Sequence, residues 1–543
     1  MTRLRRDDLV AGARLLSGLP RFLRRPVTLP EARRVLRERL ERREADFLLL
    51  AQAAVYARPG SPYRRLLDHA GCQYGDLQAL VRRDGLDGAL RALYRQGVYL
   101  TSDELKGRRP VVRGPLTFTI DPAELRSPAT TGQFRIQSSG SRGVPTAVLT
   151  DLASVRDHAV DMILCLEASG QSHAAHAVWG VPGSAAMSQV LRLASCGYPP
   201  ARWFSQVDPA AAGLHPRYRW GARLMRWGSL LAATPLPRPE YVPVEHCLAI
   251  ARWIGKVAAA GRTVQIWTFA SSAVRLCQAA REAGIDLCGA QLTTGGEPTT
   301  EARRRTVREA GAVLVPRYGA NEAGPIGFGC LAPAAADDVH VLADLNALVQ
   351  PGDDGARPGL PAEALLLTSL RATARLVLLN VSSGDQGVLS ERRCGCPMEG
   401  LGWTTHLHAI RSFEKLTTAG MTFADVDLVR VLEEVLPARF GGGPADYQLV
   451  EDEAPDGRAR LRLLAHPAIG PLDPGTVREA FLAAISQGSG VERVMGLAWR
   501  EAALVQLERR PPERTPSGKI LHLRTHRRPA PQGAPTGTGD ATP

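Results

Sequence analysis

Apolar residues along the first hundred positions recur at the three-to-four-residue spacing of a helix. One such apolar face comprises Leu36, Leu40, Phe47, Leu50 and Ala54. Thr28 and Glu31 precede this face with the spacing of a capping box, and Thr101 and Glu104 repeat that spacing further along the chain. Residues 1–106 are therefore predicted to form a helical N-terminal region.

The pattern changes between residues 107 and 415, where short apolar runs typical of strands alternate with longer amphipathic runs. Strand-like runs occupy residues 177–179, 263–269, 311–315, 364–368 and 375–379. Helix-like runs occupy residues 152–166, 245–260 and 271–283. This alternation predicts a large α/β domain whose sheet is partly parallel. In such domains ligands bind on loops at the carboxyl ends of strands.

Residues 416–528 predict a smaller α+β domain, which we expect to move relative to the large one. Helix-like runs occupy residues 426–436 and 474–485, and strand-like runs occupy residues 446–450, 458–464 and 502–507. Asp456 and Gly457 lie between two of these strands and predict a hairpin turn. The last segment, 529–543, holds mostly Pro, Gly, Thr and Ala and is predicted to be a disordered tail.

Composition narrows the class of protein. The 543 residues are 44% hydrophobic and 22% charged, which is ordinary for a soluble globular protein. No apolar run approaches the roughly 20 residues that span a bilayer, and no signal-peptide core follows the charged start. We therefore expect a cytoplasmic protein with no membrane partner. The nine cysteines are scattered rather than spaced as a disulfide framework.

The net charge of +13 is concentrated at the two ends of the chain. Residues 1–44 hold 13 arginines and six acidic residues, and residues 509–528 hold seven basic residues and one acidic residue. A nucleic-acid-binding domain would more typically interleave such charges with aromatic side chains, which make up only 5% of this chain. We expect no nucleic-acid partner, and we interpret the basic ends as solvated helix faces or as a surface for an acidic partner.

Candidate chemistry is concentrated in five polar loops. The first, residues 137–146, contains Ser138, Ser139, Gly140, Ser141 and Gly143 and ends at Thr146. Glycines let successive backbone N–H groups point to one centre, and such a concavity binds anions such as polyphosphates. The Gly-Lys-Ser/Thr end of a Walker loop is missing. The other loops are residues 293–298, 318–322, 383–385 with Arg411, and 516–519. Taken alone, each loop is also compatible with a polar surface turn.

In order and spacing these loops resemble the motifs of the adenylate-forming superfamily, which includes acyl-CoA synthetases, luciferase-like enzymes and the adenylation domains of peptide synthetases. Residues 143–146 (Gly-Val-Pro-Thr), 295–298 (Gly-Gly-Glu-Pro) and 394–396 (Cys-Gly-Cys) are most similar to the phenylacetate-CoA ligase branch. The resemblance covers residues 100–525. It implies an enzyme that uses ATP and Mg²⁺ to adenylate a small-molecule carboxylic acid and releases pyrophosphate. The acyl group would then pass to a thiol, either that of CoA or that of the phosphopantetheine on an acidic carrier protein.

The resemblance also implies roles for individual residues. The residues expected at the phosphates of the nucleotide are Ser138, Ser139, Gly140, Ser141, Gly143 and Thr146. Those expected at the adenine are Gly296, Glu297 and Pro298 beside it and Tyr318 stacked on it, with Gly319 and Asn321 in the same loop as the tyrosine. Asp385 is expected at the ribose hydroxyls, and Arg411 at the start of the crossing between domains. The catalytic residues are expected to be Lys519, which would bridge the substrate carboxylate and the α-phosphate, and Glu322, which would also ligate Mg²⁺. The resemblance does not determine which residue is the hinge between the two domains, because residues 412–415 depart from the family's aspartate-rich stretch.

Cys330, His340, Cys394 and Cys396 form a second candidate site. These ligand types suit a tetrahedral, structural Zn²⁺, and relatives in the phenylacetate-CoA ligase branch resemble the chain at these places. The alternative is that the cysteines are ordinary small buried side chains. His406 and His408 are expected to be less suitable ligands.

Other functions stay open at the level of sequence. Close alternatives are an acyl-protein synthetase and a ligase that loads a carrier protein, and an alternative of another class is a non-catalytic nucleotide-binding scaffold. Retention of Glu322, Asp385 and Lys519 favours an enzyme. Trp267 and Phe269 favour an apolar or aromatic acid as the substrate.

Overall fold

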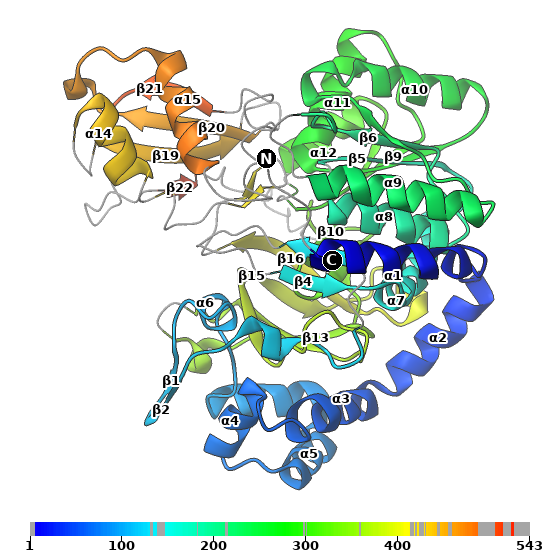
Figure 1. Cartoon of the computed structure of the whole chain (residues 1–543), viewed down its shortest axis with the longest axis vertical. Helices are drawn as coiled ribbons and strands as arrows, with labels where there is room; N and C mark the ends of the chain where they lie inside the picture. The colour runs from blue at the N-terminus through cyan, green and yellow to red at the C-terminus, as the bar shows by residue number, and fades with distance from the viewer. Residues whose placement is uncertain are drawn as a thin grey trace, which may run out of the picture.

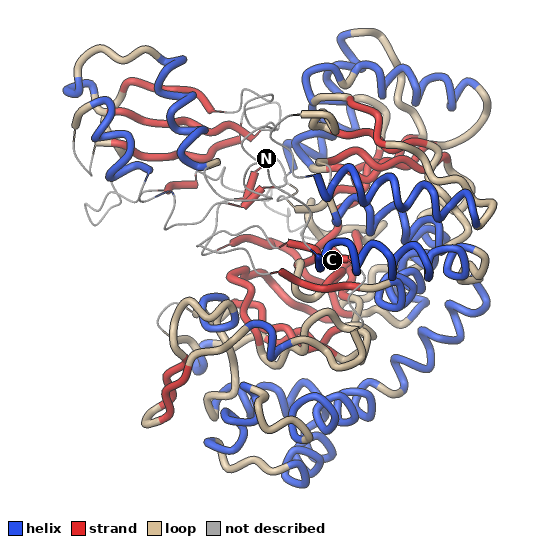
Figure 2. Tube along the Cα trace, viewed as in Figure 1, coloured by secondary structure: helices blue, strands red, loops and turns tan. Residues whose placement is uncertain are grey.

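The computed structural model describes residues 6–130, 134–137, 147–181, 183–211, 216–296, 299, 301–357, 360–412, 417–418, 421–422, 428, 431–442, 446–453, 459–486, 505–513 and 523–525. A twelve-stranded sheet forms the centre of the large domain (Figures 1 and 2). The predicted fold class is confirmed: a large α/β domain carries a helical N-terminal region and a small α+β C-terminal domain.

Six parallel strands form one half of this sheet: β5 (Ala175–Gly180), β6 (Arg202–Ser205), β7 (Pro239–Tyr241), β8 (Val264–Thr268), β9 (Ala290–Thr294) and β10 (Val313–Ala320). Most of the helices that connect them are α8 (Ser184–Ser195), α9 (Pro216–Leu231), α10 (Leu248–Ala259), α11 (Ala270–Glu282) and α12 (Glu301–Glu309). Parallel strands require such crossovers, which explains the alternating pattern in the sequence.

The other half of the sheet is antiparallel and comprises β11 (Gly324–Gly329), β12 (Val339–Val341), β13 (Asn346–Val349), β14 (Ala364–Ser369), β15 (Val381–Glu391) and β16 (Thr405–Ser412). The full order is β13-β14-β15-β16-β12-β11-β10-β9-β8-β5-β6-β7. Strand β10 joins the halves, because residues 313–316 pair parallel with β9 and residues 317–320 pair antiparallel with β11.

Smaller elements lie outside this sheet. Two-stranded pairs are β1 (Val111–Arg113) with β2 (Leu116–Phe118), β3 (Phe134–Gln137) with β4 (Ala147–Thr150), and β17 (Thr417–Thr418) with β18 (Met421–Thr422). Short 3-10 turns span Pro122–Leu125, Val244–His246, Asp353–Gly355 and Glu399–Leu401. All nine cysteines are among the described residues, and none forms a disulfide.

The N-terminal helices pack against the large domain. They are α1 (Arg6–Leu23), α2 (Leu29–Glu41), α3 (Arg43–Ala51) with a π-helical turn at Gln52–Tyr56, α4 (Pro62–His69), α5 (Tyr74–Arg95) and α6 (Ser102–Leu105). The capping boxes predicted at Thr28 and Thr101 are confirmed. Helices α1 and α2 share a hydrophobic core with α7 (Leu152–Ala168) and α8, and α3 to α5 share another with β13 to β15 (Figure 1).

One buried cation fastens α2 to the large domain. The Arg39 side chain is 4% exposed, and its guanidinium lies 3.2 Å from Asp344 and 3.7 Å from Asp161, with Asp157 as a third ionic partner. The indole N–H of Trp403 also donates to Asp344. Burial and the charge of Asp344 raise the pKa of Asp161 well above its usual range. Arg39 is therefore the shared counter-charge of a buried acidic group.

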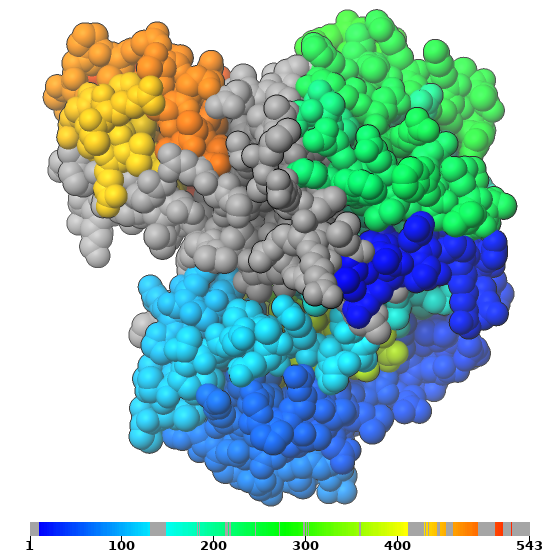
Figure 3. Space-filling model, viewed as in Figure 1, coloured from blue at the N-terminus to red at the C-terminus, as the bar shows by residue number. Residues whose placement is uncertain are grey.

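The small domain has a four-stranded sheet in the order β21-β20-β19-β22, formed by β19 (Tyr447–Glu453), β20 (Ala459–Ala465), β21 (Val505–Arg509) and β22 (Leu523–Thr525). Its helices are α14 (Leu436–Phe440) and α15 (Pro474–Ile485), and a 3-10 turn spans Pro467–Ile469. Strands β19 and β20 pair antiparallel as predicted, whereas the Asp456–Gly457 turn lies outside the described residues. In Figure 3 the atoms of this domain form a lobe of their own, coloured yellow to orange.

Two predictions of secondary structure need correction. Residues 375–379 were expected to be a strand, but they form only an isolated bridge at Leu376, and Leu376, Val377, Leu378 and Leu379 are buried in the core. The run is apolar because it lies inside the domain. In the expected helix 426–436, Leu428 is α-helical, residues 431–435 are π-helical, and a further α-helix begins at Leu436. Among the described residues, no helix combines the length and apolar character of a membrane span.

Candidate functional site

Two of the predicted loops meet through their side chains. Tyr318 lies on β10 and Asp385 on β15, and the tyrosine hydroxyl donates a hydrogen bond of 2.9 Å to Asp385. The hydroxyl of Ser383 donates to the same carboxylate oxygen over 3.3 Å. Strands β16, β12 and β11 separate β15 from β10 in the sheet, so the antiparallel half must curve to bring these side chains together. Burial and the Asp385 carboxylate raise the pKa of Tyr318 well above its usual range.

The turn between β10 and β11 is built on close backbone contacts. A Cβ atom on Gly319 would lie 2.8 Å from the carbonyl oxygen of Gly324. Gly324 has φ +89°, and a Cβ atom there would lie 2.8 Å from the ring of His158. The carbonyl oxygen of Asn321, between these glycines, accepts a 3.0 Å hydrogen bond from Arg375. The turn is held in one conformation, which fixes the direction of its side chains.

Glu322 projects from this turn into a small pocket. Its carboxylate is 16% exposed and lies 3.5 Å from the ammonium of Lys106, which is 4% exposed. The pocket is also lined by Ser102, Leu105, Ala320, Leu367, Leu378, Val381, Ser382 and Ser383. The largely buried carboxylate of Glu322 therefore shares a pocket with Ser383, which belongs to the loop that carries Asp385.

The loop after β9 lies against the start of this site. Gly296 has φ +81°, a conformation that favours glycine. A Cβ atom on Gly295 would lie 3.1 Å from the carbonyl oxygen of Arg317, the residue before Tyr318. Gly296, Tyr318, Gly319, Asn321, Glu322 and Asp385 are thus the predicted site residues that the structure brings to one region.

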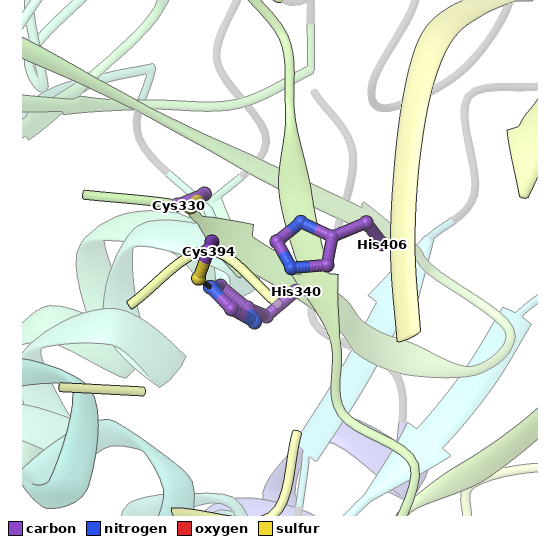
Figure 4. A group of neighbouring side chains, drawn as sticks. All are labelled: Cys330, His340, Cys394 and His406. Atoms are coloured by element: carbon purple, nitrogen blue, oxygen red, sulfur yellow. Dashed lines mark hydrogen bonds between the residues drawn. The ribbon is translucent and has the colours of Figure 1, made fainter. Parts of the chain in front are cut away.

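Three side chains of the second candidate site, Cys330, His340 and Cys394, lie close together (Figure 4). The Nε2 atom of His340 lies 3.2 Å from the sulfur of Cys396 and 3.6 Å from that of Cys394. A tetrahedral Zn²⁺ separates a nitrogen and a sulfur ligand by roughly 3.6 Å. The Nδ1–H of His340 donates to the carbonyl oxygen of Trp403 over 2.7 Å, which leaves Nε2 available to a metal.

His406 lies in this cluster as well, although it was predicted to be a less suitable ligand. The ligand atoms of Cys330, His340, Cys394 and His406 lie within 4.8 Å of one another. The Nδ1 atom of His406 lies 2.8 Å from Asp338, and its Nε2 atom has no hydrogen-bond partner among the described residues. Cys396 lies outside this group of four, but its sulfur also contacts the His340 ring.

No protein-family model and no curated protein matches the sequence. The chain does match the solved structure of a 2-hydroxyisobutyryl-CoA ligase in complex with 2-HIB-AMP and CoA, with a TM-score of 0.50, 15% identity and 90% of each chain covered. The chain has the fold of an adenylate-forming ligase. Two further matches are an open conformation of that CoA ligase (TM-score 0.44, 15% identity, 92% and 93% covered) and an amide bond synthetase from Marinactinospora thermotolerans (TM-score 0.40, 14% identity, 88% and 92% covered).

Several predicted residues of this adenylate-forming ligase fold lie outside the described residues. They are Ser138, Ser139, Gly140, Ser141, Gly143, Thr146, Glu297, Pro298 and Lys519. Strands β3 and β4 flank the first loop and pair antiparallel, with Gln137 opposite Ala147. The backbone of Arg411 pairs with Gln386, next to Asp385, but its side chain is outside the description.

Sequence reasoning missed two cations of the ligase fold that contact the site. Lys106 pairs with Glu322, and Arg375 holds the carbonyl of Asn321. Burial and the charge of Arg317 lower the pKa of Arg375 to about 10. In the sequence, Arg375 is only the charged first residue of an apolar run, and no motif near Lys106 indicates a role at the site.

Proposed function

We propose that this chain is an ATP-dependent acid–thiol ligase. It would convert a carboxylic acid to an acyl adenylate with release of pyrophosphate, and then transfer the acyl group to a thiol such as that of CoA. The observation that carries this proposal is the meeting of Tyr318 and Asp385 beside Glu322 in a fold shared with a CoA ligase. An aromatic ring can stack on the base of a nucleoside triphosphate, an ionised acceptor can bind its ribose hydroxyls, and a carboxylate can hold its Mg²⁺.

The first step is a displacement at phosphorus. An oxygen of the substrate carboxylate attacks the α-phosphorus of ATP, and pyrophosphate leaves with the electron pair of the broken P–O bond. The protein contributes mainly position and charge neutralisation. Asp385 accepts from the two ribose hydroxyls, since one carboxylate can accept several hydrogen bonds. Tyr318 offers its ring to the adenine, and its hydroxyl holds the Asp385 carboxylate in place.

Other residues take the roles that the motifs suggest. Glu322 is proposed to hold Mg²⁺, which prefers carboxylate oxygen and would neutralise phosphate charge. The ammonium of Lys106 orients that carboxylate over 3.5 Å. Residues proposed at the nucleotide are Ser138, Ser139, Gly140, Ser141, Gly143, Thr146, Gly296, Glu297, Pro298, Gly319, Asn321 and Arg411. Lys519 on the small domain is proposed to bridge the two reacting groups.

The acceptor can be CoA or the phosphopantetheine of a carrier protein. CoA is the first candidate, because the similar solved structure is described as a CoA ligase in the thioesterification state. Incubation of purified protein with ATP, Mg²⁺, labelled pyrophosphate and a panel of carboxylic acids tests the first step. Acid-dependent formation of labelled ATP is expected, and its absence with every acid, in a protein that binds ATP, would favour a nucleotide-binding scaffold. Addition of CoA or of a carrier protein then identifies the acceptor.

Replacing Asp385 with alanine should weaken ATP binding. Two hydrogen bonds to a charged acceptor contribute about 3 kcal/mol, so the dissociation constant should rise roughly 100-fold. Calorimetric titration with ATP measures it. Tyr318→Phe is the matched control, because it removes the hydroxyl that touches Asp385 and keeps the ring. A folded D385A protein with wild-type affinity would remove Asp385 from the site.

We also propose that Cys330, His340 and Cys394 hold one structural Zn²⁺, with Cys396 or His406 as the fourth ligand. Four protein ligands leave no position for a reactive water, which suits a structural role. Cys330 follows β11 and Cys394 follows β15, so the metal would tie together the strands that continue from the Glu322 turn and the Asp385 loop. It would thereby preorganise the nucleotide site rather than act in the chemistry.

Elemental analysis of purified protein should find about one zinc per chain. Cys394→Ser should lose the metal, lower the unfolding temperature and weaken ATP binding. Cys396→Ser and His406→Asn decide the fourth ligand, because only the variant that lacks a true ligand should release zinc to a chelator faster than the wild type. Full metal content in C394S would contradict the site.

A further inference from the structure

Arg317 lies on the face of β10 opposite to Tyr318, and it interacts electrostatically with two further arginines, Arg192 and Arg375. Neighbouring residues of a strand point to opposite faces. Tyr318 packs against the core that includes β13 to β15, whereas Val315, two residues before Arg317, is buried with α7 and α8. Arg317 accordingly donates to Gln189 of α8 over 3.2 Å, and its guanidinium lies 5.4 Å from the ring of Trp267.

Arg192 of α8 and Arg375 complete the cluster. Each is only 5% exposed, and their Nε atoms have no hydrogen-bond acceptor among the described residues. Within those residues none of the three arginines has a carboxylate within 4.0 Å, although Asp161 acts on Arg192 and Glu322 on Arg375 from further away. Within the part of the chain that the structure describes, the cluster therefore contains more positive charge than its surroundings neutralise.

The electrostatics of the neighbourhood agree with that excess. Burial, followed by the charges of Arg317 and Arg375, lowers the pKa of Arg192 well below its usual range. Burial lowers the pKa of Arg317 to about 10. Burial keeps the pKa of His158 well below its usual range, and the charges of the three arginines and of Arg39 lower it further. The His158 ring is therefore neutral and adds no charge to the cluster. An uncompensated buried cation destabilises a fold by several kcal/mol unless an anion pairs with it.

We propose that Arg192, Arg317 and Arg375 form an oxyanion site that receives a second anionic group of the substrate acid. The preferred substrates are then carboxylic acids with a further carboxylate, sulfonate or phosphate. This inference rests on the proposed function, which supplies the carboxyl group to be activated. The phosphates of ATP are a poorer fit, because Arg192 and Arg317 lie on the side of β10 that packs against α8, across the strand from Tyr318. In the sequence, Trp267 favoured an apolar acid as the substrate. The guanidinium of Arg317 lies over the Trp267 ring, however, and an apolar acid would leave its charge unpaired.

Thermal unfolding tests the anion site without reference to catalysis. Sulfate at saturating concentration, compared with chloride at equal ionic strength, should raise the unfolding temperature of the full-length protein by roughly 2 °C more than that of Arg192→Met. Arg281→Met is the control, since Arg281 is half exposed and paired with Glu309, and it should respond like the wild type. In chloride alone R192M should be at least as stable as the wild type, because it replaces an unpaired buried charge with an apolar chain. Equal sulfate responses, or an R192M protein that fails to fold, would overturn the proposal.

Pyrophosphate release with paired acids tests the substrate class. Suitable pairs are butyrate with succinate, hexanoate with adipate, and benzoate with terephthalate. Wild-type kcat/KM should favour at least one diacid over its partner by roughly 10²-fold, because the monoacid leaves the arginines unpaired. R192M should reduce that ratio by about tenfold and leave the KM for ATP unchanged. Preference for monoacids, or an equal loss for both members of a pair, overturns the inference and leaves the ligase intact. No release with any acid counts against the proposed function, and the sulfate experiment then decides the anion site alone.

Discussion

Replacing Lys519 with alanine should lower the rate of adenylation by roughly 10²–10³-fold, which is the size of the loss of one preorganised charge at a transition state. Lys519 stands in the sequence Pro-Ser-Gly-Lys-Ile, and it is the single lysine of a basic segment otherwise rich in arginine. An ammonium at this place would stabilise the charge that develops between the substrate carboxylate and the α-phosphate. ATP binding should change little, because the ribose and base contacts belong to the large domain.

Two rates measured separately make this result diagnostic. Single-turnover formation of acyl adenylate should fall in K519A, whereas transfer from a pre-made acyl adenylate to CoA should persist, since the small domain is expected to move Lys519 away in that step. Lys256→Ala serves as the control because Lys256 is an exposed residue of α10. A wild-type adenylation rate in K519A would show that another group supplies the charge.

Replacing Arg39 with methionine should lower the free energy of unfolding by about 3–5 kcal/mol, the usual effect of removing one partner from a buried ionic group. Asp161 and Asp344 would then share a buried space without their cation. Chemical denaturation of both proteins measures the difference. Arg34→Met on the same helix is the control: Arg34 is 61% exposed in a pair with Glu38, and its loss should change stability by less than about 0.5 kcal/mol.

The pH dependence of this effect has a definite sign. The pKa of Asp161 is raised in the folded protein, so between the unfolded value near pH 4 and the higher folded value the native state binds more protons. Stability from this group therefore falls as the pH rises through that window. R39M removes a charge that lowers this pKa, so it should be destabilised less near pH 4 than at pH 7. An equal loss at both values would mean that Asp161 does not titrate with folding.

The structure explains why parts of the site could be found in the sequence and other parts could not. The Tyr318 and Asp385 loops are local patterns in which a polar residue follows an apolar run, and each was identified as a candidate. Their contact joins residues 67 apart on strands that are not neighbours in the sheet, so it depends on how the antiparallel half curves.

The residues missed by sequence reasoning share one property, which is that their importance comes from burial. Lys106, Arg192 and Arg317 look like solvated surface charges in a linear pattern, because hydrophobic periodicity reports only the apolar positions. The run 375–379 was misassigned for the same reason, since an apolar run inside a core does not have to be a strand. His406 lies near the candidate zinc ligands because β16 pairs with β12 beside His340.

The sequence by itself determined the fold class, the helix caps at Thr28 and Thr101, the order of the polar loops and the types of residue they carry. These features are encoded locally, in the spacing of apolar positions and in short turn sequences. The tertiary structure alone decided which side chains meet: Tyr318 with Asp385, Glu322 with Lys106, and Arg317 with Gln189 of α8. Such contacts and the charges they leave unpaired arise from the packing of distant segments, and local sequence pattern carries no record of that packing.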